Sequence, residues 1–206
     1  MPSIVLRSFA TLLAIVAAPL ALSAQEHNPA HHAAGAPDPH APTVVIIVRH
    51  AEKAASPAND PPLTETGVAR TRALVELLRD AKVGVVMHTP TTRTRETARP
   101  VAERFGLTAE VLPMGPLPVH AAAVAEAVRR HPGKTIVVVG HSNTILAYVA
   151  ALGGPQKGEL CDHNYDGLYT LVISENEVRL VEGRYGPPNP PQTAPCAGIA
   201  PSAPRP

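Results

Sequence analysis

Three short runs of Val and Ile constrain the fold of this 206-residue chain more than any other feature of its sequence. They cover residues 44–48, 83–87 and 136–139, and none shows the alternation of apolar and polar residues that marks a half-exposed strand. Continuous apolar strands of this kind are typical of a parallel sheet that helices cover on both faces. The runs therefore predict an α/β domain with a buried central sheet.

Helical patterns occupy the segments between these runs. We expect helices at residues 64–78, 91–105, 119–130 and 144–152. Thr64 is the expected N-cap of the first helix. Two further strand-like stretches, 168–173 and 178–185, flank the turn "SENE" and predict a hairpin. The expected fold is a three-layer α/β/α sandwich, with a mostly parallel central sheet and an antiparallel hairpin at one edge.

The N-terminus has the organisation of a secretory signal peptide. Within residues 1–24, Arg7 precedes an apolar run, which is followed by small residues. An uncleaved membrane anchor is the alternative, but the run is short for a membrane span and contains Pro19. The sequence therefore predicts a protein that is exported, either to a periplasm or out of the cell.

Two proline-rich segments flank the predicted domain. Residues 25–42 contain four histidines and four prolines and are expected to form a His/Pro-rich linker. Residues 186–206 contain eight prolines and are expected to form a Pro-rich tail. The folded domain is therefore predicted to span residues 43–185.

The charge balance does not suggest nucleic acid or an anionic membrane as a partner. The chain has 18 basic and 17 acidic residues, and removal of the signal peptide takes away only Arg7, which leaves 17 of each. A neutral protein has no basic surface excess with which to bind nucleic acid or an anionic membrane. We therefore expect no nucleic-acid partner, and no stable membrane insertion after signal cleavage.

The two cysteines, Cys161 and Cys196, would enter an oxidising compartment after export. A disulfide between them would close a loop of about 36 residues and stabilise the fold by about 4 kcal/mol. The alternative is a pair of free thiols, and the disulfide is favoured. A zinc site on these cysteines is not expected, because they lack the close spacing of metal-binding pairs.

Polar residues follow each of the three apolar runs. The first run ends in Arg49 and His50, the second is followed by Arg93 on the opening turn of a helix, and the third ends in Gly140 and His141. Ligand sites in open α/β sheets lie beyond the carboxyl ends of the strands. Two arginines and two histidines at one rim favour an oxyanion site, because guanidinium groups and backbone N–H groups bind phosphate well.

The motifs "RHAEK", "LTETGVAR", "TPTTRTRETA" and "GHSNT" occur in an order that resembles the histidine phosphatase (phosphoglycerate mutase-like) superfamily, branch 1. The resemblance covers about residues 43–185. It implies that His50 is the nucleophile that becomes phosphohistidine, and that Arg49, Arg93 and His141 complete the phosphate pocket. It implies no metal or cofactor.

The chemistry of these residue types agrees with that implication. A neutral imidazole can accept a phosphoryl group and then pass it to water, which divides one displacement into two. Arg49, Arg93 and a protonated His141 can hold the charge on the transferred group without Mg²⁺. Asn143 lies where the chain turns into a helix, so we expect it to contribute to phosphate binding; the alternative is that it is an ordinary helix cap.

The acid that protonates the leaving group is not evident from the sequence. Many members of the superfamily carry a glutamate between the second arginine and the second histidine, but the corresponding stretch "VLPMGPLPVH" has no acidic residue. The candidate substitutes are Glu52, beside the nucleophile, and Asp162 or Asp166 in "CDHNYDGLY", with Glu52 and Asp162 the two that we carry forward. The alternative is that no donor is needed, as for an aryl oxide leaving group.

Two functions are consistent with the sequence. The first is an exported, metal-independent phosphatase that hydrolyses a small phosphorylated substrate through a phosphohistidine on His50. The alternative is a catalytically weak module that binds a phosphorylated ligand on the same fold. The remaining histidines in the predicted domain are expected to be structural or surface residues, and these are His88, His120, His131 and His163.

Overall fold

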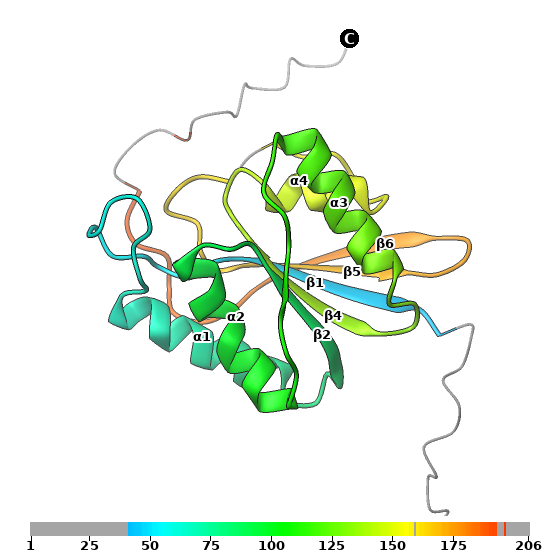
Figure 1. Ribbon diagram of the computed structural model, residues 1–206, viewed down its shortest axis with the longest axis horizontal. Coiled ribbons are helices and arrows are strands. Elements are labelled where there is room, and N and C mark those ends of the chain that lie inside the picture. The colour runs from blue at the N-terminus through cyan, green and yellow to red at the C-terminus, as the bar shows by residue number, and fades with distance from the viewer. Residues whose placement is uncertain (1–40, 159, 193–195, 197–206) are drawn as a thin grey trace, which may run out of the picture. The chain divides into compact units, whose positions relative to one another are not determined.

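The computed structural model describes residues 41–158, 160–192 and 196 (Figure 1). The elements of this part of the chain are, in order, β1 (Thr43–Arg49), α1 (Glu65–Leu78), β2 (Val83–His88), α2 (Thr92–Phe105), β3 (Glu110–Val111), α3 (Leu117–Arg129), β4 (Thr135–Gly140), α4 (Ile145–Ala151), β5 (Gly167–Ile173) and β6 (Val178–Arg184).

The strands form one sheet in the order β3-β2-β4-β1-β5-β6. Strands β3, β2, β4 and β1 pair in parallel, whereas β5 is antiparallel to both β1 and β6. The predicted sheet, mostly parallel with an antiparallel edge hairpin, is therefore confirmed. Strand β3 has only two residues, because it pairs with just Met87 and His88 of β2.

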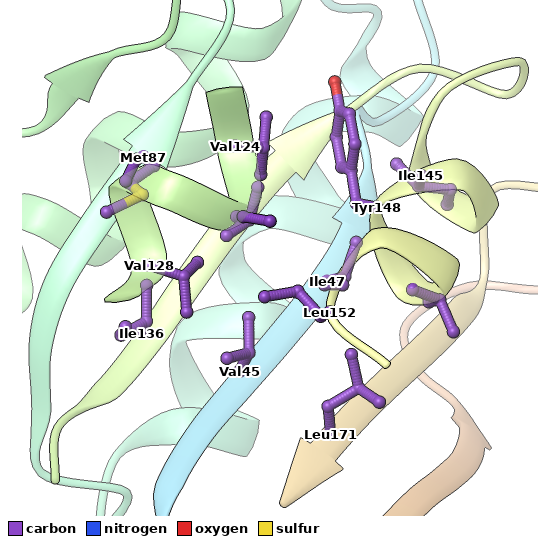
Figure 2. Close-up of a cluster of buried hydrophobic side chains, with 14 of the residues drawn as sticks. Val45, Ile47, Met87, Val124, Val128, Ile136, Ile145, Tyr148, Leu152 and Leu171 are labelled. Carbon is purple, nitrogen blue, oxygen red and sulfur yellow. The ribbon is translucent and has the colours of Figure 1, made fainter. Parts of the chain in front are cut away.

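Helices cover both faces of the sheet, with α1 and α2 on one face and α3 and α4 on the other (Figure 1). Successive side chains of a strand point to opposite faces. In β1, Val45 and Ile47 therefore pack with α3 and α4 in the cluster that Figure 2 shows. Ile46 and Val48 pack with α1 and α2 in a second cluster. Both faces are buried, which explains why the strand sequences do not alternate.

The predicted helices are present with boundaries that differ by two residues or fewer. Thr64 caps α1 as expected, since its side-chain oxygen accepts a 3.1 Å hydrogen bond from the Gly67 backbone N–H. Helix α3 begins at Leu117, earlier than expected, and Pro118 lies in its first turn. Proline is compatible with a first turn, because the N–H it lacks has no intrahelical partner there.

The ends of the chain are described only in part. The predicted signal peptide, residues 1–24, lies outside the described residues, as do residues 25–40 of the predicted linker. Within the described residues, no helix is both long and apolar enough to span a membrane. The favoured Cys161–Cys196 disulfide is present and joins the segment after α4 to the C-terminal tail.

Candidate active site

The carboxyl ends of β1, β2 and β4 lie side by side and bring the predicted residues together. Arg49 at the end of β1 is in register with Gly140 at the end of β4. The His50 backbone N–H donates to the Gly140 carbonyl at 2.9 Å. The rings of His50 and His141 lie with their centroids 5.4 Å apart. The pairing of β1 with β4 therefore places two histidines at one rim.

The four predicted residues Arg49, His50, Arg93 and His141 line one cavity of about 360 Å³. Ser142, Asn143 and Thr144, the N-cap of α4, line it as well. Asn143, predicted to contribute to phosphate binding, is exposed at this cavity. The structure thus gathers the candidate phosphate-binding residues around a single space.

His50 is buried, with only 3% of its surface exposed. Its Nδ1 lies 2.8 Å from the Ala51 carbonyl oxygen, which can only accept a hydrogen bond. The proton therefore belongs on Nδ1, and Nε2 keeps its lone pair. Burial, together with the positive charges of Arg49 and Arg93, lowers the pKa of His50 to about 2. His50 is thus a neutral imidazole with a free Nε2, which is the form that a nucleophile requires.

Arg49 is held by the loop after α4. Its Nη1 donates to three backbone carbonyl oxygens, at 2.7 Å from Asp162, 3.1 Å from Asn164 and 3.3 Å from Cys161. The ring of Tyr165 lies 4.1 Å from the guanidinium carbon, within the range of a cation–π contact. The guanidinium is therefore anchored through Nη1, while its buried Nε has no hydrogen-bond partner among the described residues.

The contacts of His141 also favour a neutral imidazole. Arg93 Nη2 lies 3.4 Å from His141 Nδ1, and the Thr89 hydroxyl lies 2.9 Å from Nε2. An arginine can only donate, so Nδ1 accepts and Nε2 carries the proton. Burial, followed by the charges of Arg93 and Arg49, lowers the pKa of His141 to about 4. The neighbouring cations that suit phosphate binding thus keep this imidazole uncharged at neutral pH.

Glu52, one of the two candidate acids, forms a buried ion pair. Both of its carboxylate oxygens accept hydrogen bonds from Arg70, at 2.7 to 3.1 Å. Arg70 is completely buried, and Glu52 does not line the cavity. The sequence did not predict this pairing. It links the segment beside the nucleophile to α1, which carries Arg70.

Asp162, the second candidate acid, lies at the cavity. It is the only carboxylate among the described residues that line it, and its side chain is 96% exposed. The Ser142 hydroxyl donates to its Oδ1 at 3.2 Å, and Arg49 Nη2 lies 3.6 Å from the same oxygen. Of the two candidates, Asp162 is therefore the one placed to reach a leaving group.

Several lining residues were not predicted for the site. His120 on α3, expected to be structural or at the surface, is buried at the cavity and pairs through Nε2 with the Tyr148 hydroxyl. Met114 and Leu117 also line the cavity and are partly exposed. No motif marks these residues in the sequence. The packing of α3 brings Leu117 and His120 to the cavity, and Met114 lies in the segment that precedes α3.

The sheet order and the cavity describe an α/β protein in which two arginines and two histidines line one space at the carboxyl ends of the strands. A family model described as "Histidine phosphatase superfamily (branch 1)" matches residues 45–114. This match confirms the resemblance predicted from the motifs and supports phosphatase activity in general. It includes His50 and Arg93 and ends before His141.

Solved structures with this fold include histidine phosphatases. The protein histidine phosphatase SixA complexed with tungstate is 22% identical, with a TM-score of 0.54 over 69% of this chain and 96% of SixA. YhfR of Bacillus stearothermophilus is 17% identical, with a TM-score of 0.54 over 67% and 95% of the two chains. A mycobacterial glucosyl-3-phosphoglycerate phosphatase is 19% identical, with a TM-score of 0.52 over 69% and 98%. At these identities the likeness establishes the fold. No curated protein matches the chain.

Proposed function

We propose that the protein is an exported, metal-independent phosphatase that hydrolyses a small phosphomonoester through a phosphohistidine on His50. The observation that carries this proposal is the state of His50. Its Nδ1 proton is fixed by the Ala51 carbonyl, its Nε2 lone pair is free, and it lines the same cavity as two arginines.

The reaction has two displacements at phosphorus. In the first, His50 Nε2 forms a bond to phosphorus while the bond from phosphorus to the ester oxygen breaks, and the leaving oxygen takes a proton from Asp162, which solvent protonates again. In the second, water attacks phosphorus, the P–N bond breaks, and inorganic phosphate forms with the imidazole neutral again. Arg49 and Arg93 hold the equatorial oxygens in both steps, which is the charge stabilisation that phosphoryl transfer needs.

His141 changes its role when an anion binds. A phosphate dianion next to its imidazole favours the charged form and raises the pKa of His141, which burial and the two arginines otherwise depress. The same dianion attracts Arg93, whose contact with His141 Nδ1 is already long at 3.4 Å. His141 is then able to donate to the transferred group from Nδ1.

The walls of the cavity favour a small leaving group of mixed character. Met114 and Leu117 give one part of the lining an apolar surface, whereas Ser142 and Asp162 give another part hydrogen-bonding groups. Asp162 is the proposed proton donor for leaving groups that need one. The export of the protein rests on its N-terminal sequence, so the substrate would be a phosphate ester outside the cytoplasm.

The test is turnover of an aryl phosphate in EDTA, combined with tungstate binding. Wild-type protein should turn over, His50→Ala should not, and His131→Ala, which lies outside the cavity, should match the wild type. Tungstate should still bind His50→Ala, because Arg49 and Arg93 remain. If wild-type protein binds tungstate but turns over no member of a broad phosphate panel, the protein is a phospho-ligand binding module instead.

A further inference from the structure

The loop that holds Arg49 contacts the C-terminal segment at both of its ends. We call residues 161–165 the clamp loop, because its carbonyl oxygens at 161, 162 and 164 bind Arg49 Nη1. Its only described hydrogen bond within the loop is from the Asn164 N–H to the Cys161 carbonyl at 2.9 Å. A loop with one internal bond needs contacts from elsewhere to hold a buried guanidinium.

Besides the Ser142 hydroxyl, which donates to Asp162, two residues after the last strand contact the clamp loop, one at each end. The first is Cys196, which is bonded to Cys161 in the disulfide. The second is Asn189, whose side-chain oxygen accepts from the backbone N–H groups of Tyr165 at 2.8 Å and Asp166 at 3.1 Å. The Asn189 amide also donates to the Asp166 carboxylate at 2.8 Å. The clamp loop is therefore bracketed by the C-terminal segment.

The C-terminal segment is itself fixed to the domain by Arg70. The Arg70 guanidinium donates to the Tyr185 and Pro187 carbonyls, each at 2.8 Å. The Tyr185 N–H donates to the Asp166 carbonyl at 2.9 Å. Arg70 is buried and also binds Glu52, so it connects this segment to the chain beside the nucleophile. The contacts thus run from Arg70 through the segment to the clamp loop and Arg49.

We propose that residues 185–192 and Cys196 form a strap that positions Arg49 for phosphate, and that the Cys161–Cys196 disulfide closes this strap so that reduction loosens the site. The proposal rests on the proposed function, in which Arg49 binds the transferred group. Asn189 and the two cysteines are positioning residues, since none of them lines the cavity.

The chemistry of opening is ordinary thiol–disulfide exchange. A dithiol reductant transfers two electrons and two protons, the S–S bond breaks, Cys161 and Cys196 become thiols, and the reductant becomes a disulfide. Reduction leaves the backbone of Cys161 unchanged, but it removes the covalent bond that joins Cys161 to the strap. The Arg49 guanidinium is then held less firmly in position, although it keeps its charge.

The experiment compares oxidised protein with protein reduced by dithiothreitol, with the two thiols confirmed by mass spectrometry. We expect reduction to weaken the binding of inorganic phosphate about tenfold and to lower kcat/KM for an aryl phosphate about 10- to 100-fold, the size of effect that a misplacement of about 1 Å produces. The Cys161→Ser/Cys196→Ser double variant should match the reduced protein and should not respond to the reductant.

Two further variants separate positioning from stability. Asn189→Ala keeps the disulfide and should weaken phosphate binding by a similar factor. Gly106→Ala, at a left-handed residue that ends α2 with φ at 65°, should lower the stability without changing phosphate affinity. Circular dichroism establishes that each protein is native at the temperature of measurement.

The outcomes are distinct. Unchanged phosphate affinity in native, fully reduced protein, or in Asn189→Ala, overturns the strap. If reduction unfolds the protein, Asn189→Ala decides alone, because its disulfide is intact. If phosphate binding depends on the strap but the protein shows no turnover, the result supports the positioning role of the strap and contradicts the proposed phosphatase activity.

Discussion

At the scale of single residues, the site is defined by where protons and charges are fixed. His50 and His141 lie 5.4 Å apart by ring centroid, yet their protons occupy different nitrogens. The Ala51 carbonyl holds the proton on Nδ1 of His50, whereas Arg93 excludes a proton from Nδ1 of His141. The first imidazole can therefore attack phosphorus, while the second is set to receive a proton when an anion displaces Arg93.

Asp162→Asn tests the proton donor at this scale. The substitution keeps the backbone carbonyl that binds Arg49 and removes the ability of the side chain to donate a carboxylic acid proton. General acid catalysis typically contributes about 100- to 10,000-fold, and it matters most for a poor leaving group. We expect an alkyl phosphate to slow by about 100-fold or more and a nitrophenyl phosphate to change little, measured as kcat/KM. Equal losses with both substrates would show that Asp162 is not the donor.

At the scale of elements, the first turn of α1 lies directly against the chain beside the nucleophile. A Cβ built on Gly67 would lie 2.3 Å from the Glu52 carbonyl oxygen, which is closer than real contacts allow. The same carbonyl accepts the Thr64 backbone N–H at 2.9 Å, so α1 and Glu52 are joined at this point. The glycine of "LTETG" is therefore required by close approach.

Gly67→Ala should reverse the usual effect of this substitution in a helix. Alanine is favoured over glycine by about 1 kcal/mol at an exposed helical position. At Gly67 the clash requires α1 to move away from Glu52, so we expect a loss of stability in urea denaturation and a loss of turnover. Thr66→Ala, at an exposed position next to it, is the matched control and should be neutral or slightly stabilising. Stabilisation by Gly67→Ala would contradict the described packing.

The sequence predicted the elements well where one local pattern decides them. The runs at β1, β2 and β4 are apolar because both faces are buried, and Thr64 is a local cap. Strand β3 has no such pattern, because only two of its residues pair with β2 and two residues are too few to form an apolar run. The convergence of Arg49, His50, Arg93 and His141 followed from parallel strands ending at one rim.

The remaining features of the site depend on contacts between distant segments. The Glu52–Arg70 pair joins residues 18 apart, and Arg49 is bound by carbonyls more than 100 residues later in the chain. His120 reaches the cavity only through the packing of α3. None of these partners is specified by spacing or composition. Glu52 was therefore predicted without its partner Arg70, and His120 was not predicted for the site.

At the scale of the whole molecule, the buried histidines couple stability to pH. Their pKa values in the folded protein, about 2 for His50 and about 4 for His141, lie below the ordinary value of 6.5. At these two residues the unfolded chain therefore binds more protons as the pH falls below about 6.5, and the stability that the two neutral histidines contribute is fully present only above that pH. Each histidine then lowers the free energy of unfolding by up to about 1.4 kcal/mol per pH unit, down to its folded pKa.

Denaturation in urea at pH 7, 6 and 5 measures this coupling. We expect the wild-type protein to lose stability steadily over this range, and His50→Asn and His141→Asn each to show a shallower slope. The slope is the relevant quantity, because each substitution also changes packing. A slope that neither variant alters would mean that these two histidines are not neutral in the folded protein.

The central claim is that His50 carries the phosphoryl group, and the most direct measurement is to trap it. The protein is mixed with an aryl phosphate that carries the label on its phosphoryl group, the reaction is quenched rapidly without acid, and the labelled residue is located by peptide mapping. We predict label on His50 through an N–P bond that is stable in base and labile in acid. His141→Ala should slow both its formation and its breakdown by about 100- to 1,000-fold, the usual cost of removing one such contact from the transition state. Label on another residue, or full turnover by His50→Ala, would contradict this account.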